Sequence, residues 1–271
     1  MKGVMVMRIL NVLGGILMLA AVLLMSGCSD SPNASGQLGE LKIRLADSPG
    51  DYDQVNIIVT RVDVHLADAD SSSGWATIND TPATYDLLVL RNGANAILGN
   101  AQLAPGQYTQ IRLIIGEGST VVVDSVSYPL DIPSGFQTGV KLNHGFTIEG
   151  GRLYELMLDF DADRSIHETG SHQYKLQPVI RVQAVTTSGS ISGLIAPIVS
   201  RALVSTVLGT DTVSTVADTL TGAFELIALP AGLYDFSIVP TDTLYADTTI
   251  TAVQVVAQQN TDLGTITLRT R

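Results

Sequence analysis

The sequence predicts an all-β protein: two β-sandwich domains in series, behind a lipoprotein signal peptide and a short flexible tether. Three observations support this prediction. An apolar segment at residues 9–25 precedes Cys28, the only cysteine of the chain. The rest of the chain consists of short runs rich in β-branched and aromatic residues, separated by Gly, Pro and Asn turn signals. No segment beyond residue 28 repeats its apolar residues convincingly with the 3.6-residue period of a helix.

Residues 1–27 are predicted to be a cleaved signal peptide, because Lys2 and Arg8 precede the apolar run and small residues follow it. The run could also nearly cross a bilayer, so an uncleaved membrane anchor is the alternative. The stretch before Cys28 resembles the lipobox of bacterial lipoproteins, although Met25 stands where leucine is usual. The resemblance implies that Cys28 carries acyl chains such as palmitate and becomes the first residue of the mature protein.

Ser29 after the cysteine implies, by the same resemblance, sorting to the outer membrane, with the protein facing either the periplasm or the surface. Several acyl chains anchor stably, since each buried methylene contributes ~0.8 kcal/mol. Residues 28–39 are small and polar and are predicted to be the tether. The body that follows has no free thiol and no disulfide, as suits an exported protein that folds on its core alone.

The composition is acidic, with 26 Asp and Glu against 15 Lys and Arg and a formal net charge of −11. Removing the signal peptide would remove two of the basic residues and leave 15 − 2 = 13. Such a chain repels the phosphates of nucleic acid and of anionic lipid, so neither is expected as a partner. Cations, neutral sugars and other proteins remain possible, and acidity is also a common solubility device.

Residues 40–187 are expected to form the first β-domain. In "LKIRL" (41–45) apolar and basic residues alternate, and strand-like runs follow at 54–66, 85–90, 107–116, 120–130 and 154–162. Only 92–103 could hold a short helical turn. A joint at 186–193 leads to the second domain, 190–271, where a strand at 224–227, a turn at 230–232 and a strand from Leu233 are expected to form a hairpin.

Two resemblances accompany these patterns. "LADSPGDYDQVNIIVTRVDVH", "YDLLVLRNG", "LAPGQYTQIRL", "IPSGFQTGVKL" and "LDFDADRSI…YKLQPVIRV" occur in order and resemble the bacterial lipoprotein family of domain of unknown function 4382. That resemblance implies a lipid-anchored exported β-domain with no known activity and no catalytic residues. "GAFELIALPAGLYDFSIVP" (222–240) resembles carboxypeptidase-regulatory-like, transthyretin-type sandwiches, and "LAPGQYTQIRL" (103–113) repeats its pattern.

Asp159, Asp161 and Asp163 alternate with core residues along an expected strand. If the strand runs through Asp163, the outer two lie ~13 Å apart, too far to share a calcium ion bound at ~2.4 Å. An antiparallel strand at 174–182 would place Lys175 and Arg181 opposite them. A solvated, charged sheet face is therefore favoured over a metal site.

"HETGSH" (167–172) resembles the zincin motif, but His167 and His172 are five residues apart and would not share a helix face. A loop could still bring both and an aspartate around zinc. Asp47, Asp51 and Asp53 surround a Ser-Pro-Gly turn that could converge on a cation, although aspartate and glycine are ordinary turn formers.

Trp75, the only tryptophan, is either a sugar-stacking platform or an anchor at a strand edge. Nucleophile signatures are missing, since "GSISG" has Ile191 where an elbow serine would stand. We therefore expect no enzyme, no catalytic residues and no cofactor, but a binding or interaction protein for a glycan or an envelope protein. The alternative is a calcium- or zinc-dependent module or hydrolase with acidic loops at Asp47–Asp53 and Asp159–His172.

Overall fold

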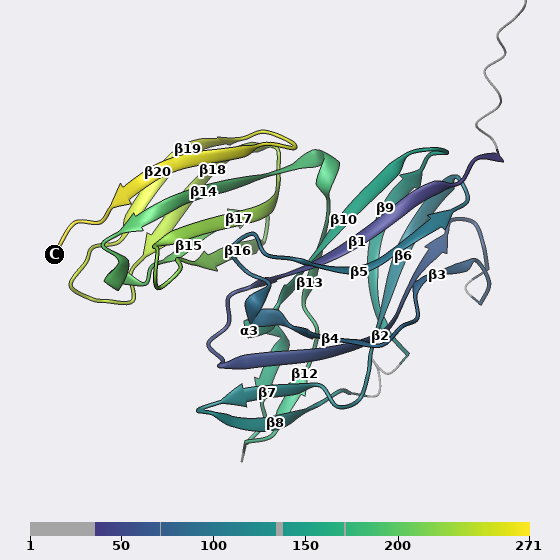
Figure 1. Ribbon diagram of the computed structural model, residues 1–271, viewed down its shortest axis with the longest axis horizontal. Coiled ribbons are helices and arrows are strands. Elements are labelled where there is room, and N and C mark those ends of the chain that lie inside the picture. Colours follow the sequence, from purple (N-terminus) through teal and green to yellow (C-terminus); the bar gives the residue numbers. More distant parts are fainter. Residues whose placement is uncertain (1–35, 71, 134–137, 171) are drawn as a thin grey trace, which may run out of the picture. The chain divides into compact units, whose positions relative to one another are not determined.

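The computed structural model describes residues 36–70, 72–133, 138–170 and 172–271, which belong to one unit and are almost entirely β (Figure 1). The prediction of an all-β fold is thus confirmed. The predicted signal peptide, Cys28 and the tether up to residue 35 lie outside the described residues and stay predictions. Among the described residues, no helix is long and apolar enough to cross a membrane.

The first half of the unit is built from two sheets. Its elements are β1 (Gly39–Ser48), β2 (Gln54–Leu66), β3 (Trp75–Asn79), β4 (Ala83–Asp86), η2 (Leu87–Val89), β5 (Ala96–Leu103), β6 (Gly106–Ile115), β7 (Thr120–Val123), β8 (Val126–Asp131), β9 (Val140–Ile148), β10 (Leu153–Asp161), α3 (Ala162–Ser165), β11 (Ile166–Glu168), β12 (Tyr174–Leu176) and β13 (Ile180–Ala184). One sheet has the order β13-β10-β1-β5. The other has the order β11-β12-β8-β7-β2-β6-β9, with β3 and β4 on the second edge of β2.

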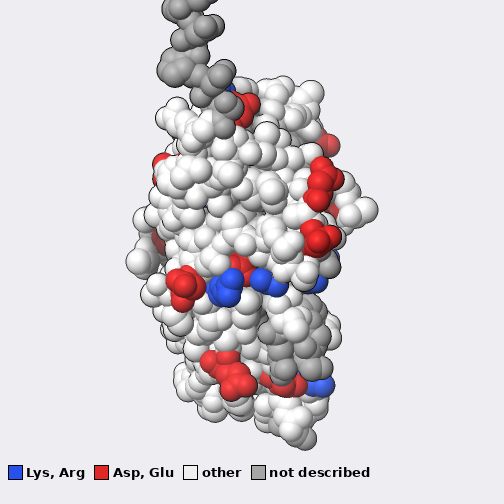
Figure 2. Space-filling model, turned by 90° about the vertical axis from the view of Figure 1, so that its right-hand side faces the viewer, with Lys and Arg blue, Asp and Glu red and all other residues white. Residues whose placement is uncertain are grey.

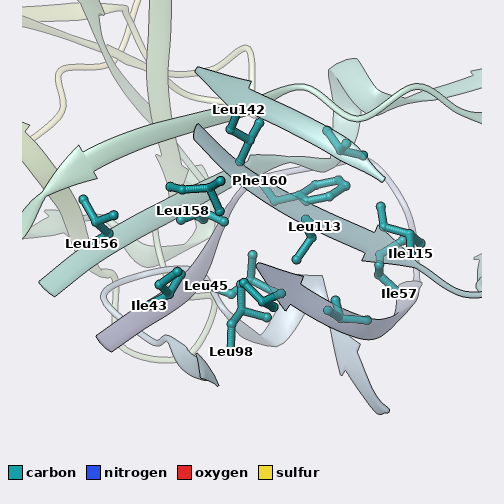
Figure 3. Packing of buried hydrophobic residues seen from close by; sticks show 14 of the residues in the cluster. Ile43, Leu45, Ile57, Leu98, Leu113, Ile115, Leu142, Leu156, Leu158 and Phe160 are labelled. Carbon is teal, nitrogen blue, oxygen red and sulfur yellow. The ribbon is translucent and has the colours of Figure 1, made fainter. Parts of the chain in front are cut away.

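Alternation along the strands explains how these sheets pack. In β1, Leu41, Ile43 and Leu45 are buried, whereas Lys42 is only half-buried between them, as "LKIRL" predicts. Figure 3 shows side chains of both sheets meeting in one core, among them Phe160 of β10. Apolar burial of this kind contributes roughly 25 cal/mol per Å² and holds the two sheets together.

The second half has its own hydrophobic cluster, drawn from residues 191–268. Its elements are η3 (Val185–Thr187), β14 (Ser188–Ala196), η4 (Ile198–Ser200), β15 (Leu203–Leu208), β16 (Asp211–Val216), β17 (Ala223–Pro230), β18 (Gly232–Val239), β19 (Thr248–Val255) and β20 (Asn260–Thr267). The sheets β17-β14-β20 and β16-β15-β18-β19 enclose this cluster. The predicted domain limits at residues 187 and 190 fall where η3 passes into β14, and they stay a prediction.

Two expectations about single elements are wrong. Residues 92–103 hold no helical turn, because β5 is extended from Ala96 and the short helical element, η2, precedes it. The strands on either side of the 230–232 turn do not form a hairpin either. β17 pairs with β14 and β18 with β15 and β19, so the turn connects the two sheets across the core. Both strands carry a large buried aromatic residue, Phe224 and Phe236, and each face needs the other sheet to cover it.

The expected strand at 174–182 is two strands in different sheets. β12 lies in the nine-stranded sheet and β13 in the four-stranded one. Pro178, which has no N–H to donate to a ladder, stands between them. Arg181 therefore lies opposite Asp159 as expected, but Lys175 lies opposite His167 and away from the aspartates.

Candidate functional site

The aspartates at the end of β10 are less exposed than the sequence indicates. Asp159 forms an ion pair with Arg181, with Oδ2 2.8 Å from Nη2 and only 13 % of its side chain exposed. Met157 on the same face is buried with Ala228. The expected solvated face is thus wrong for these positions, because residues of the second half of the unit cover it.

The strand does not reach Asp163. Asp161 ends β10 and accepts a hydrogen bond from the Arg164 N–H at 2.9 Å, so it caps the single turn of α3. Burial raises the pKa of Asp161 above its ordinary value. Asp163 lies within that turn and is exposed. A cap and a turn replace the straight aspartate column.

Asp47, Asp51 and Asp53 do not converge. Asp47 is buried at the end of β1 and accepts a hydrogen bond from the Ala162 N–H at 3.1 Å. Asp51 is exposed, and Asp53 accepts a bond from the Ser125 N–H at 2.7 Å. The three residues thus follow the ordinary roles of aspartate at strand ends and turns.

The side chain of Asp47 is protonated at neutral pH. Burial is the largest cause that raises its pKa to about 9, the charges of Asp159 and Asp161 add to the effect, and the Ala162 N–H opposes it. A neutral carboxyl is a poor cation ligand. Its Oδ2 has no hydrogen-bond partner among the described residues.

His167 and His172 are both exposed. Nδ1 of His172 lies 3.4 Å from Oε1 of Glu168, and its ring stacks on Tyr128 with centroids 5.7 Å apart. Within the described ranges, no group of three or more His, Cys, Asp or Glu residues is arranged to hold a metal ion. Among the described residues, no observation therefore favours the cation-dependent alternative.

Trp75 lies at the start of β3, and its neighbours come from β2 and β6. The guanidinium carbon of Arg112 lies 4.0 Å from the ring centroid, which is a cation–π contact. The ring of His65 meets it edge-on, with centroids 4.8 Å apart. Nε2 of His65 lies 2.9 and 3.1 Å from the carbonyl oxygens of Ser73 and Asp70, so it carries the proton and ties down the loop before β3.

Strand register extends this contact into two rows on the outer face of the nine-stranded sheet. The first row is Trp75, His65, Gln110 and Asn143, and the second is Thr77, Asp63, Arg112 and Lys141. Each row crosses β3, β2, β6 and β9 in that order. We call these eight residues, together with Arg61, the polar face.

The polar face points outward because the residues between its members point inward. Val62, Val64, Ile111 and Leu113 alternate with it along β2 and β6 and are buried in the core. Further along the same strands, Thr60 and Ile114 line a hollow of about 470 Å³ that borders the face.

Asp63 is the centre of the polar face and is fully buried. Its Oδ2 accepts hydrogen bonds from Nη2 and Nε of Arg112 at 2.7 and 3.1 Å, and its Oδ1 accepts from Nε of Arg61 at 2.7 Å. The Thr77 hydroxyl donates to the same Oδ1 at 2.9 Å. Burial raises the pKa of Asp63, but the bonds from Arg112, Arg61 and Thr77 outweigh it and lower the pKa below its usual value. An ionised carboxylate thus fixes both guanidinium groups.

The β9 side of the polar face is open. Nε2 of Gln110 donates to Oδ1 of Asn143 at 2.7 Å, and Lys141 is exposed. Figure 2, which looks at the side where β3, β6 and β9 lie in Figure 1, shows basic side chains in a short band across a mostly neutral surface, with acidic groups at the left end of the band, above it and below it. The face therefore offers hydrogen-bond donors, acceptors, an aromatic ring and positive charge.

Of these residues, the sequence singles out only Trp75. Asp63 and Arg112 have a signal in the polar positions of "TRVDVH" (60–65) and "TQIRL" (109–113), and Lys141 has one in "VKL" (140–142), because these positions alternate with apolar ones. That alternation shows that they share a face of their own strand. Only the pairing of four strands brings them side by side.

Comparison with known proteins gives one family match. The family model of a domain of unknown function, DUF4382, matches residues 38–178. None of the curated proteins matches the chain. The family match ends before the second half, so the transthyretin-type resemblance of 190–271 stays a prediction.

Solved structures with some likeness include three bacterial pilus proteins. The minor pilin GBS52 of Streptococcus agalactiae has 9 % identity, covers 85 % of this chain and 96 % of its own, and has a TM-score of 0.26. The shaft pilin SpaA of Lactobacillus rhamnosus GG has 10 % identity, with 87 % and 97 % covered and a TM-score of 0.25. A C-terminal fragment of the pilus adhesin SpaC of the same organism has 10 % identity, with 86 % and 98 % covered and a TM-score of 0.22. At these TM-scores the likeness carries no argument about this chain.

Proposed function

The chain belongs to the DUF4382 family, and from its polar face we propose that it is an exported, non-enzymatic binding protein that holds a glycan at the cell envelope. The observation that carries the proposal is the pair of polar rows across four strands. They combine an aromatic ring with amide, hydroxyl and cationic groups. Sugars present hydroxyls and apolar C–H faces, which these groups can bond and stack against.

The face is arranged before any ligand arrives. Asp63 holds Arg61 and Arg112, Arg112 packs on Trp75, and His65 ties the loop that leads into β3. Groups held in this way lose little side-chain entropy on binding, which favours affinity.

The same bonds support binding over catalysis. A general base works best with a pKa near the working pH. The pKa of Asp63 is lowered, and its oxygens already accept four hydrogen bonds from three side chains. Such a carboxylate positions the neighbouring side chains and is poorly suited to accept or donate a proton during a reaction.

The location is part of the proposal. Acyl chains on Cys28 would anchor the protein in the outer membrane, and residues 28–39 would be the tether between the anchor and the β unit. The protein would face either the periplasm or the cell surface. The partner would then be an envelope or extracellular glycan.

A glycan array with the full-length protein in a nonionic detergent tests the proposal. We expect selective binding, and we expect a double variant, Gln110→Ala with Asn143→Ala, to weaken it roughly fivefold or more because several donors and acceptors are lost. Asn260→Ala, which removes an exposed asparagine on β20, is the matched control and should bind as wild type. An empty array, or equal binding by the double variant, would overturn the proposal.

A further inference from the structure

The charge of the polar face identifies its ligand more closely. Resting on the proposed function, we infer that this face binds acidic polysaccharides whose sugars carry carboxylate groups. Three cations, Arg61, Arg112 and Lys141, surround one anion, Asp63, which leaves a local charge of 3 − 1 = +2. The whole chain carries −11, so this surface differs in sign from the molecule around it.

Lys141 is a cation of the polar face that has no compensating anion among the described residues. It lies directly opposite Arg112 in the β6–β9 ladder, where Cβ atoms are about 5 Å apart and like charges repel. Asp63 compensates Arg112 on the other side, but Lys141 forms no ion pair with any described residue. A carboxylate placed between Lys141 and Arg112 would remove the repulsion and bond both.

Arg61 offers a second contact of the same kind. Its Nε bonds Asp63 and its Nη2 donates to the Thr77 hydroxyl at 2.9 Å, while 45 % of the side chain stays exposed. A guanidinium carries five N–H donors, so a held and partly exposed arginine keeps donors for an incoming carboxylate.

The neutral row beside these cations argues for a sugar between the charges. Gln110 and Asn143 form a hydrogen-bonded pair next to Arg112 and Lys141, and Trp75 ends the row. The four strands span about 14 Å at ~4.8 Å per step, so hydroxyl-binding and carboxylate-binding groups lie within one short stretch of polymer. A polymer that carries both hydroxyls and carboxylates matches both rows, and its sugar rings also present C–H faces to Trp75, which polyglutamate lacks.

A matched pair of polymers tests the inference: polygalacturonate and the same polymer with its carboxylates methyl-esterified. Binding is measured with full-length protein in nonionic detergent at low and high salt. We expect polygalacturonate to bind at least tenfold more tightly than the ester and to weaken with salt, because screening acts on exposed charges. Lys141→Gln and Arg61→Gln should each weaken it roughly two- to fivefold.

Lys175→Gln is the control, since it removes an exposed lysine from β12 of the same sheet and should change nothing. Equal binding of both polymers, lost in the Gln110 and Asn143 variant, would overturn the acidic preference and leave the proposed function standing. Equal competition by polyglutamate would assign the face to acidic proteins and overturn the inference. Binding of neither polymer, with neutral glycans bound on the array, would overturn it as well.

Discussion

At the scale of single residues, two buried aspartates show how surroundings decide the state of the same side chain. Asp63 has two guanidinium groups and a hydroxyl in bonding range, and its pKa is lowered. Asp47 has one backbone N–H and two neighbouring carboxylates, and its pKa is raised to about 9. Burial opposes ionisation in both cases, and only Asp63 has partners strong enough to reverse the result.

Asp47 predicts a pH dependence of stability. From about pH 4 to pH 9 the folded protein retains a proton on Asp47 that the unfolded chain releases, so this group lowers the free energy of unfolding by about 1.4 kcal/mol per pH unit as pH rises. Asp47→Asn keeps the acceptor for the Ala162 N–H and cannot ionise. We expect the variant to gain over wild type progressively from pH 5 to pH 9, measured by urea denaturation.

Asp51→Asn is the control, because Asp51 is exposed and should give the same difference from wild type at every pH. A constant offset between Asp47→Asn and wild type across this range would show that Asp47 is ionised in the folded state.

At the scale of elements, the two similar sequences "LAPGQY" and "LPAGLY" form the same structure. In each, the chain passes from one sheet to the other, from β5 to β6 and from β17 to β18. The hydroxyl of Tyr108 donates to the Ala104 carbonyl at 3.1 Å, and that of Tyr234 to the Pro230 carbonyl at 2.8 Å. Both bonds reach four residues back and hold the turn, in the manner of a tyrosine corner.

These corners give a prediction with an internal control. Tyr108→Phe and Tyr234→Phe each remove one hydroxyl and leave a carbonyl without its side-chain partner, so each should lower the free energy of unfolding by about 1 kcal/mol. Tyr128→Phe should have a smaller effect, because the Tyr128 hydroxyl makes no hydrogen bond to any described residue. Chemical denaturation of the three variants measures these free energies of unfolding. Equal decreases in all three would refute the role of the corner bonds.

At the scale of the whole molecule, specific hydrogen bonds join the two hydrophobic clusters within one unit. The Asn92 side chain donates to the Val216 carbonyl at 2.9 Å and accepts from the Thr215 hydroxyl at 2.7 Å. Arg181 donates from Nη1 to the Ala228 carbonyl at 2.7 Å while it pairs with Asp159. The expected surface aspartate is thus part of the contact between the two halves.

The prediction at this scale concerns membrane attachment through Cys28. Cys28→Ser removes the thiol that would carry the acyl chains, so the protein should lose labelling with radioactive palmitate and move from the membrane to the soluble fraction. Cell fractionation and labelling measure both results. Ser26→Ala, which keeps a small residue before the cysteine, should stay membrane-bound, and an unchanged distribution of Cys28→Ser would contradict the anchor.

Much of the fold follows from local pattern. Alternation with a period of two shows which face of each strand is buried, as in β1 and β10, and turn residues show where strands end. These signals predict an all-β chain. The five collinear segments add the family, which the match to residues 38–178 confirms.

The local pattern does not show which strands pair with each other, because pairing joins residues far apart in the chain and many pairings satisfy the same alternation. The turn at 230–232 looks like a hairpin yet connects two sheets, and Pro178 divides one expected strand between two. For the same reason the sequence indicates an exposed charged face at the aspartates of β10, whereas residues of the second half cover part of that face. The face of Trp75, Asp63, Arg112 and Lys141 exists only because β3, β2, β6 and β9 lie side by side. The sequence by itself thus determined the strands and their buried faces, and the tertiary structure decided which polar residues meet.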